Sequence, residues 1–327
     1  MRTTFINTLL ELADTDDRIW LLCGDLGYSV LEPFFERFPA RFINVGVAEQ
    51  NMIGIAAGLA QSGHVAFCYS IANFPTLRCL EQIRNDVCYH DCNVNIVSVG
   101  GGVAYGAQGY SHHALEDLAV MRALPNMVVA APGDPLEVRS LTRALVNHPG
   151  PGFLRLGKAG EAVLHDAVPS LEIGQVLPLR EGNDVILLST GGMLETALQV
   201  AARLHQRGVS TGVTSVPFLK PLDTAYVTTV AQRTALLCTV EEHGSIGGLG
   251  EAVASCLAQL SGIRARLLPF SMPESSTKGV SGDQHYLRTR GGLDPDSIFA
   301  AVTDALEVLP KRYSAMTSHW RRQEQSS

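Results

Sequence analysis

A single carboxylate interrupts an uncharged region in the stretch Val45-Gly46-Val47-Ala48-Glu49-Gln50-Asn51-Met52. Residues 42–47 are mostly apolar and predict a strand, and residues 49–61, with small side chains four apart, predict a helix. An ionised group that is buried without a partner costs several kcal/mol, so Glu49 is a candidate functional residue. A Glu near the positive end of a helix dipole would explain the same pattern, and the spacing alone leaves both interpretations open.

Outward from this stretch, β-rich runs alternate with helical patterns, which is typical of βα units that form a parallel sheet between helices. We expect a first set of strands at 19–23, 42–47, 65–69, 94–99, 127–130 and 152–156, and helices at 49–61, 76–89, 114–124 and 135–147. The alternation stops after residue 156. A second set follows, with strands at 185–189, 209–216, 235–240 and 264–268, and helices at 194–206, 249–260 and 295–306.

The sequence therefore predicts an α/β protein with two domains, each a mainly parallel sheet flanked by helices. The expected boundaries are residues 1–160 for the first domain, 161–175 for a linker and 176–310 for the second domain, with a polar tail at 311–327. A chain of 327 residues, 46% of them hydrophobic and 17% charged, can bury two such cores.

Charge and local composition exclude several functions. The net charge is −7 and no block of Lys and Arg occurs, so we expect no binding to nucleic acid or to anionic membrane. The N-terminus lacks the apolar segment and cleavage site of a signal peptide, and polar turns interrupt the uncharged residues 50–77. We therefore expect a cytoplasmic protein without a membrane span.

The seven cysteines form no Cys-x-x-Cys pair. Most of them lie in apolar strand or helix patterns, which is typical of reduced thiols in a cytosolic protein. Cys88, His90 and Cys92 have the side chains of metal ligands, but a zinc site needs three or four ligands and no second cluster follows. We therefore expect no metal site in this chain.

The segment around Glu49 resembles the pyrimidine-binding domain of thiamine-diphosphate enzymes in the transketolase and 1-deoxyxylulose-5-phosphate synthase group. That domain has a strand, then a Glu, then a helix rich in Gly and Ala. The resemblance extends from about Thr3 to about Leu309 and covers only the second half of the usual enzyme. It implies a pyrimidine-binding domain followed by a transketolase C-terminal domain, with Glu49 hydrogen-bonded to N1′ of the aminopyrimidine ring of thiamine diphosphate, the cofactor that acts as electron sink.

The resemblance implies two further cofactor contacts. Phe74 lies between a strand and a helix, where the family has an aromatic ring that stacks on the pyrimidine. Core packing is the alternative for this ring. Asp25 follows the first strand, in line with a family Asp that approaches the thiazolium across the dimer interface. Ser29, four residues later, matches a position that contacts substrate phosphate in some members, although a simple turn would also explain this segment.

Substrate contacts are implied by the loop Gly106-Ala107-Gln108-Gly109-Tyr110-Ser111-His112-His113, which resembles the G-E-D-G-P-T-H-Q loop of many transketolases. His112 falls on the family's substrate-contacting His, which can donate to a developing oxyanion or pass a proton. Ala107 and Gln108 replace the acidic pair of the family, and His113 replaces its Gln. These departures put ordinary pentose-phosphate chemistry in doubt.

Two other positions concern the substrate. The run Ser98-Val99-Gly100-Gly101-Gly102 lacks the His that the family has at this strand end. Its glycines could open space for a different acceptor or form a tight turn, and the sequence leaves both interpretations open. Arg155 lies near a phosphate-binding Arg of the family, and a guanidinium group suits phosphate and sulfonate equally well.

The family's motifs for binding the diphosphate are missing. The family uses a separate domain with a G-D-G stretch, an Asn about thirty residues later and a bridging Mg²⁺ or Ca²⁺. This sequence contains neither that pattern nor a Walker A loop. We therefore expect an N-terminal, diphosphate-binding partner subunit that holds Mg²⁺ or Ca²⁺, in an α2β2 assembly.

The resemblance thus predicts the β (C-terminal) subunit of a split transketolase-like enzyme, active only with its partner. The expected reaction transfers a two-carbon ketol unit between a ketose derivative and an aldehyde, with Glu49 and His112 as catalytic residues. One alternative is the β subunit of the E1 component of a 2-oxo-acid dehydrogenase, which shares the fold and the Glu. Another is a non-catalytic regulatory or scaffolding relative.

Overall fold

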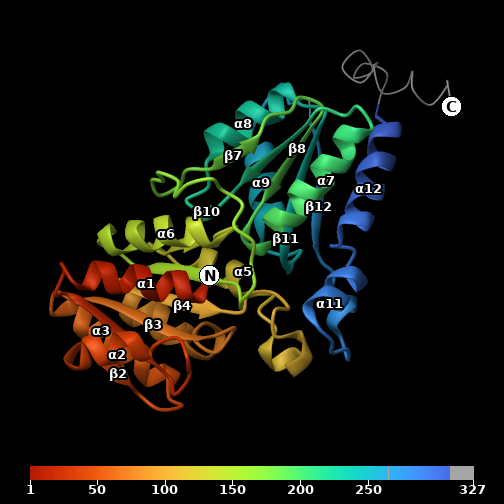
Figure 1. The fold of residues 1–327 in the computed structure, drawn as a ribbon. Helices are drawn as coiled ribbons and strands as arrows, with labels where there is room; N and C mark the ends of the chain where they lie inside the picture. The colour runs from red at the N-terminus through yellow and green to blue at the C-terminus, as the bar shows by residue number, and fades with distance from the viewer. Residues whose placement is uncertain (264, 310–327) are drawn as a thin grey trace.

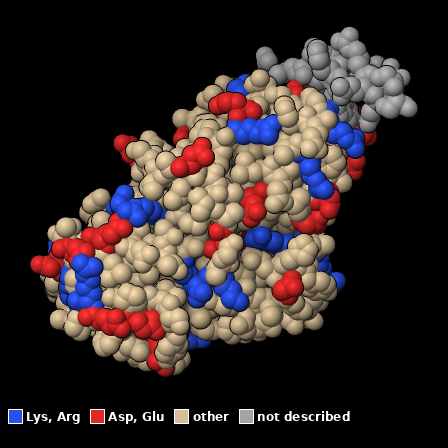
Figure 2. Space-filling model, in the orientation of Figure 1, with Lys and Arg blue, Asp and Glu red and all other residues tan. Residues whose placement is uncertain are grey.

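A computed structural model describes residues 1–263 and 265–309, and the expected polar tail lies outside them. The chain forms two sheets with helices on both faces (Figure 1). None of the helices in the described ranges is both long and apolar enough to cross a membrane. Figure 2 shows acidic and basic side chains interspersed on one face of the molecule.

The first sheet has seven strands in the order β10-β5-β6-β4-β3-β1-β2. Their bounds are β1 Ile19–Cys23, β2 Phe42–Asn44, β3 Val65–Ile71, β4 Val94–Val99, β5 Val128–Ala130, β6 Gly152–Leu156 and β10 Phe218–Lys220. Neighbouring strands are parallel except for β10, which comes from the second half of the chain and pairs antiparallel with β5. A strand from the second half of the chain therefore forms one edge of the first sheet.

Helices bury both faces of this sheet. On one face α1 (Arg2–Ala13) and α6 (Pro135–Asn147) pack together, and α2 (Glu32–Arg37) adds Phe34 to the same core. On the other face lie α3 (Glu49–Gln61) and α5 (Asp117–Ala123). Successive residues of β3 point to opposite faces, so Phe67 faces the first core and Cys68 the second.

The second sheet has the order β12-β11-β8-β9-β7, with only β7 antiparallel to its neighbour. Its strands are β7 Leu177–Arg180, β8 Val185–Ser189, β9 Thr211–Ser215, β11 Leu236–Gly244 and β12 Arg266–Met272. One face is covered by α7 (Leu194–Gln206) and α12 (Pro295–Glu307), and the other by α8 (Thr224–Arg233) and α9 (Leu249–Leu257). The short helices α10 (Glu274–Thr277) and α11 (Gln284–Arg290) follow β12.

The expected α/β class is confirmed, and several predicted elements have the expected bounds, among them α3, α6 and α7. The single helix predicted at 76–89 is wrong. The chain instead forms a 3₁₀ turn at Leu77–Cys79, a helical turn α4 at Leu80–Gln82 and a π-helical segment at Ile83–Cys88. The helix predicted from residue 114 starts at Asp117, because Ala114 and Gly102 exchange backbone hydrogen bonds that hold residue 114 outside the helix. The sequence did not predict α1, α2, α8 or α11.

Candidate functional site

The predicted cofactor residues follow adjacent strands of the first sheet. Because β2, β1, β3 and β4 are parallel neighbours, the loops after them leave the sheet at the same edge. Glu49 follows β2, Asp25 follows β1, Phe74 follows β3 and His112 follows β4. The carboxyl edge of a parallel sheet is where such folds bind ligands.

Glu49 is the first residue of α3 and is only 2% exposed. It packs beside Gly24, where an added Cβ would lie 3.5 Å from Glu49 Cγ. Its carboxylate makes no capping hydrogen bond to its own helix and instead accepts a 2.7 Å hydrogen bond at Oε2 from Arg78 Nη1. A capping hydrogen bond therefore does not explain this residue.

Arg78 connects Glu49 to an aromatic group. The guanidinium carbon lies 4.5 Å from the ring centre of Phe74. The rings of Phe74 and His112 meet edge-on, with their centres 5.2 Å apart. The ring centres of His112 and Tyr105 lie 6.4 Å apart. Phe74 is half-buried and outside the hydrophobic cores of the described residues, so core packing does not explain it.

Sequence reasoning missed Arg78 and Tyr105. A signal for Arg78 was present, because residues 50–77 contain no Asp, Glu, Lys or Arg. Arg78 is therefore the first charged residue after Glu49 and the first cation available to balance it. Tyr105 carried no comparable signal, because its position depends on the turn that Gly100 forms against its ring.

Asp25 and Ser29 lie in the exposed loop after β1, each with a left-handed backbone (φ 55° and 62°). Asn44 holds this loop, since its Oδ1 accepts from the Asp25 amide at 2.9 Å and its Nδ2 donates to Asp25 Oδ1 at 3.2 Å. The Ser29 amide donates to Glu32 Oε1 at 2.7 Å. Left-handed residues other than Gly cost about 1–3 kcal/mol each and cluster at ligand sites. The predicted cofactor and substrate contacts of Asp25 and Ser29 stay predictions.

The glycine run after β4 forms a packed turn. Gly100 and Gly102 have φ values of 86° and 67°. A Cβ at Gly100 would overlap the Tyr105 ring, one at Gly101 the Arg155 side chain, and one at Gly102 the Glu242 carboxylate. The glycines admit these side chains, which favours the interpretation that the run forms a tight turn.

The side chains of the loop at 106–113 differ in their exposure to solvent. Gln108 is exposed and His112 is half-buried, with Ser111 Oγ 3.0 Å from His112 Nδ1. His113 is only 1% exposed and lies against Tyr110, with Nε2 3.5 Å from the carbonyl oxygen of Gly106. A substrate contact by His113 would therefore require the loop to move. Gln108 and His113 stay predictions.

Arg155, near the end of β6, connects the two domains. It is 6% exposed, and its Nε donates to Asp117 Oδ2 at 2.8 Å. Its Nη2 donates to the carbonyl oxygens of Ala114 at 2.6 Å and Glu242 at 3.0 Å. The side chain also lines an interdomain cavity of about 140 Å³. Its contacts give Arg155 a structural role, and its predicted substrate contact stays a prediction.

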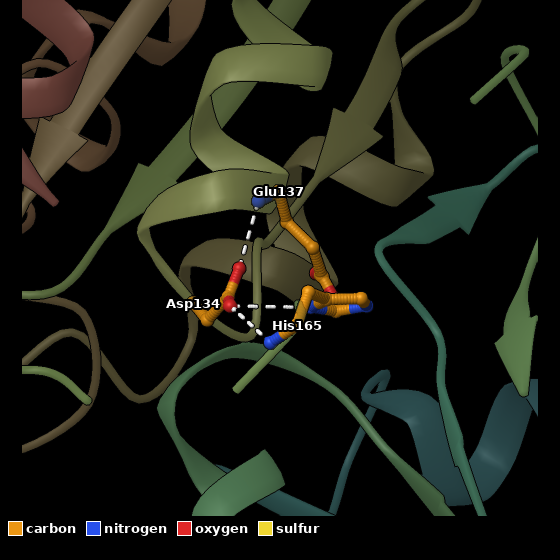
Figure 3. A group of neighbouring side chains, drawn as sticks. All are labelled: Asp134, Glu137 and His165. Atoms are coloured by element: carbon orange, nitrogen blue, oxygen red, sulfur yellow. Dashed lines mark hydrogen bonds and ion pairs between the residues drawn. The ribbon is translucent and has the colours of Figure 1, made fainter. Parts of the chain in front are cut away.

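A second polar cluster, absent from the sequence-based expectations, comprises Asp134, Glu137 and His165 (Figure 3). Asp134 caps α6 and accepts backbone N–H groups from Glu137 at 2.8 Å, Leu164 at 2.8 Å and His165 at 3.0 Å. His165 Nδ1 lies 3.1 Å from Asp134 Oδ2, and Nε2 lies 3.6 Å from Glu137 Oε1.

The distances among these three side chains would allow them to bind a metal ion, but their existing hydrogen bonds argue against a metal site. Both Asp134 oxygens already accept N–H groups, and the imidazole turns a different nitrogen toward each carboxylate. Burial alone would raise the pKa of Asp134, but hydrogen bonds from His165 and the backbone outweigh it and lower the pKa to about 2. The cluster therefore behaves as a charged cap that ties residues 164–165 to α6.

This cluster predicts a pH dependence of stability. Burial raises the pKa of Glu137 to about 7 from its ordinary 4.5, so between these values the folded chain holds a proton that the unfolded chain has lost. The neighbouring Asp134 carboxylate, 3.1 Å from Nδ1, raises the pKa of His165, and the stabilisation from this ion pair is also lost as pH rises. Glu137 therefore makes the free energy of unfolding fall as pH rises from its ordinary pKa of 4.5 to about 7, and His165 makes it fall further above its ordinary pKa of 6.5.

Urea unfolding at pH 5, 6, 7 and 8 measures this slope. The variant Glu137→Gln should show a flatter profile, and Glu307→Gln, which changes an exposed carboxylate on α12, should match the wild type. Equal slopes for the wild type and Glu137→Gln would contradict the assignment.

The chain thus has two α/β domains, and a buried carboxylate, a guanidinium group and an aromatic ring lie together at the carboxyl edge of the first sheet. The family described as transketolase, pyrimidine binding domain, matches residues 1–160, and that described as transketolase, C-terminal domain, matches residues 174–298. The chain belongs to the transketolase family.

Individual relatives agree with this placement. The chain is 36% identical to a subunit of the apulose-4-phosphate transketolase of Phocaeicola vulgatus, over 95% of this chain and 97% of the relative. It is 34% identical to the 6-deoxy-6-sulfo-D-fructose transketolase subunit SqwH of a Clostridium species, over 94% of each chain. A solved split-gene transketolase, described as an inactive beta4 tetramer, superposes with a TM-score of 0.85 at 35% identity, over 94% of this chain and 99% of that one.

Proposed function

We propose that this chain is the β subunit of a split transketolase-like enzyme that transfers a two-carbon ketol unit between a ketose derivative and an aldehyde. The observation that carries the proposal is the cluster of Glu49, Arg78, Phe74 and His112 at the carboxyl edge of the first sheet. The relatives that match this chain along most of its length are named as transketolase subunits. Those names favour ketol transfer over a 2-oxo-acid dehydrogenase or a non-catalytic relative.

The side chains fit an aminopyrimidine ring. Among the described residues, Oε1 of Glu49 has no hydrogen-bond partner, so it can accept from a ring nitrogen. Phe74 is half-buried and offers an aromatic surface for a flat ring. Bound thiamine diphosphate supplies the electron sink for breaking the ketose carbon–carbon bond.

We propose that His112 acts on the substrate. Its Nδ1 lies 3.0 Å from the Ser111 hydroxyl, which orients the ring and leaves Nε2 to exchange a proton with a substrate oxygen. Gln108 and Ser29 are exposed in loops at the same sheet edge, and with Arg155 and His113 they complete the set of substrate contacts that we propose.

We propose that a partner subunit binds the diphosphate through Mg²⁺ or Ca²⁺ and forms an α2β2 enzyme. The relatives that this chain matches over 97% and 94% of their own length are named as transketolase subunits, which supports this proposal, as does the description of the similar beta4 tetramer as inactive. A cytoplasmic location is supported by the seven cysteines, all of which are free thiols.

Co-expression with a candidate diphosphate-binding subunit tests this function. We expect the purified complex to bind thiamine diphosphate in the presence of Mg²⁺, measured by calorimetric titration, and this chain alone to show no saturable binding. Tight binding by this chain alone would contradict the need for a partner. If no complex with any such subunit binds the cofactor, the proposed function is wrong.

A further inference from the structure

Arg78 contacts both side chains that we assign to the pyrimidine ring. Its Nη1 donates to Glu49 Oε2 at 2.7 Å, and its guanidinium carbon lies 4.5 Å from the Phe74 ring centre. The Arg78 side chain is 45% exposed, whereas Glu49 is 2% exposed. The partly exposed guanidinium of Arg78 therefore contacts both the buried carboxylate of Glu49 and the ring of Phe74.

The contact distinguishes the two oxygens of Glu49. Arg78 occupies Oε2, and within the described residues no donor binds Oε1. A carboxylate held at one oxygen cannot rotate freely about its last side-chain bond, so the direction of the other oxygen is set. Charge-assisted hydrogen bonds of this kind are short and directional.

The backbone between Phe74 and Arg78 is itself anchored. Thr76 Oγ1 donates to the carbonyl oxygen of Asn73 at 3.2 Å, and Cys79 Sγ lies 3.5 Å from the carbonyl oxygen of Phe74. Both Thr76 and Cys79 are fully buried. The ring and the cation thus lie on one short turn that these two hydrogen bonds hold.

We propose that Arg78 is a positioning residue that fixes the Glu49 carboxylate and the Phe74 ring for the cofactor. The proposal rests on the proposed function and adds to it a residue whose effect is exerted through its two neighbours. Arg suits this role better than Lys, because a flat guanidinium can stack on an aromatic ring while it donates to a carboxylate.

The first test uses the complex with the partner subunit, thiamine diphosphate and Mg²⁺. We expect Arg78→Met to weaken cofactor binding in calorimetric titration at least tenfold and to lower kcat at least tenfold. Arg78→Lys should recover part of both losses, because it restores the donor but not the flat stacking group. The matched control is Arg84→Met, which removes an exposed guanidinium that contacts only its neighbour Asn85 among the described residues and should behave as wild type.

The second test needs neither partner nor cofactor. Urea unfolding of the full chain is measured for Arg78→Met, Glu49→Gln and the double variant. We expect the double variant to lose less stability than the two single losses added together, because each single change already removes the same contact. Additive losses would overturn the proposal, whatever the activity data show.

The outcomes separate this inference from the proposed function. If the wild-type complex does not bind the cofactor, the proposed function fails, while the unfolding cycle still decides whether Arg78 holds Glu49. If the wild type binds but Arg78→Met binds equally well, Arg78 has no positioning role. Tighter binding by Arg78→Met would also overturn the proposal, since it would show that Arg78 competes with the cofactor.

Discussion

Glu49→Gln is expected to lower ketol transfer by about 10³-fold in the assembled enzyme, in line with the usual contribution of a positioned acid or base. The amide keeps the shape of the carboxylate, but it carries no charge and cannot share a proton with the pyrimidine ring. Arg78 would also lose the anion that it contacts at 2.7 Å. The reaction should therefore fail even where the cofactor still binds.

Steady-state assay of the complex with the partner subunit measures this loss, and circular dichroism checks that the fold is kept. The control is Glu307→Gln, an identical change at an exposed position of α12 on the second sheet, which should leave the rate unaltered. Activity of Glu49→Gln within about tenfold of the wild type, well short of the loss expected for an essential acid or base, would remove Glu49 from the mechanism.

Arg155→Met is expected to have the largest effect on stability, lowering the free energy of unfolding by about 3–5 kcal/mol. The substitution leaves Asp117 buried without the guanidinium that donates to it at 2.8 Å. It also removes the donor to the carbonyl oxygens of Ala114 and Glu242, which belong to different domains. Loss of one partner of a buried ion pair is costly because the remaining charge cannot be solvated.

Chemical denaturation of the full chain measures this effect. Arg139→Met is the control, because it breaks a surface ion pair with Glu11 and should cost no more than about 1 kcal/mol. The double variant Arg155→Met with Asp117→Leu should regain part of the loss, since no charge then remains unpaired. If Arg155→Met lowered the free energy of unfolding as little as the control does, the hydrogen bonds of Arg155 would not hold the two domains together.

Local pattern was enough to predict many of the regular elements. The strands β1, β4, β6 and β8 are short apolar runs, and they appear with the predicted bounds because residues buried on both faces of a sheet need no long-range information to be recognised. The segment at 76–89 failed for the opposite reason. Its sequence is helical in composition, but Cys79 Sγ donates to the carbonyl oxygen of Phe74, and the chain winds as a 3₁₀ turn, a helical turn and a π-helical segment.

Glu49, Phe74 and His112 of the candidate site could be named from sequence, whereas Arg78 could not. Glu49 and Phe74 were identified from a carboxylate in an apolar region and an aromatic ring after a strand, supported by a family resemblance. Arg78 was missed because its ion pair with Glu49 joins residues 29 positions apart that follow β3 and β2, two strands separated in the sheet by β1. Arg155 was predicted to contact the substrate, and only the packing of the second sheet against the first revealed that its donors hold Asp117 and two carbonyl groups.

The sequence by itself determined the α/β class, the two sets of alternating elements and the place of Glu49 between a strand and a helix, because these follow from local hydrophobic periodicity. The tertiary structure alone decided which charges meet. It paired Glu49 with Arg78, packed the glycine run against Arg155 and Glu242, and added β10 to the first sheet. Such contacts join residues far apart in the chain, and they form only when burial forces each charged or polar group to find a partner.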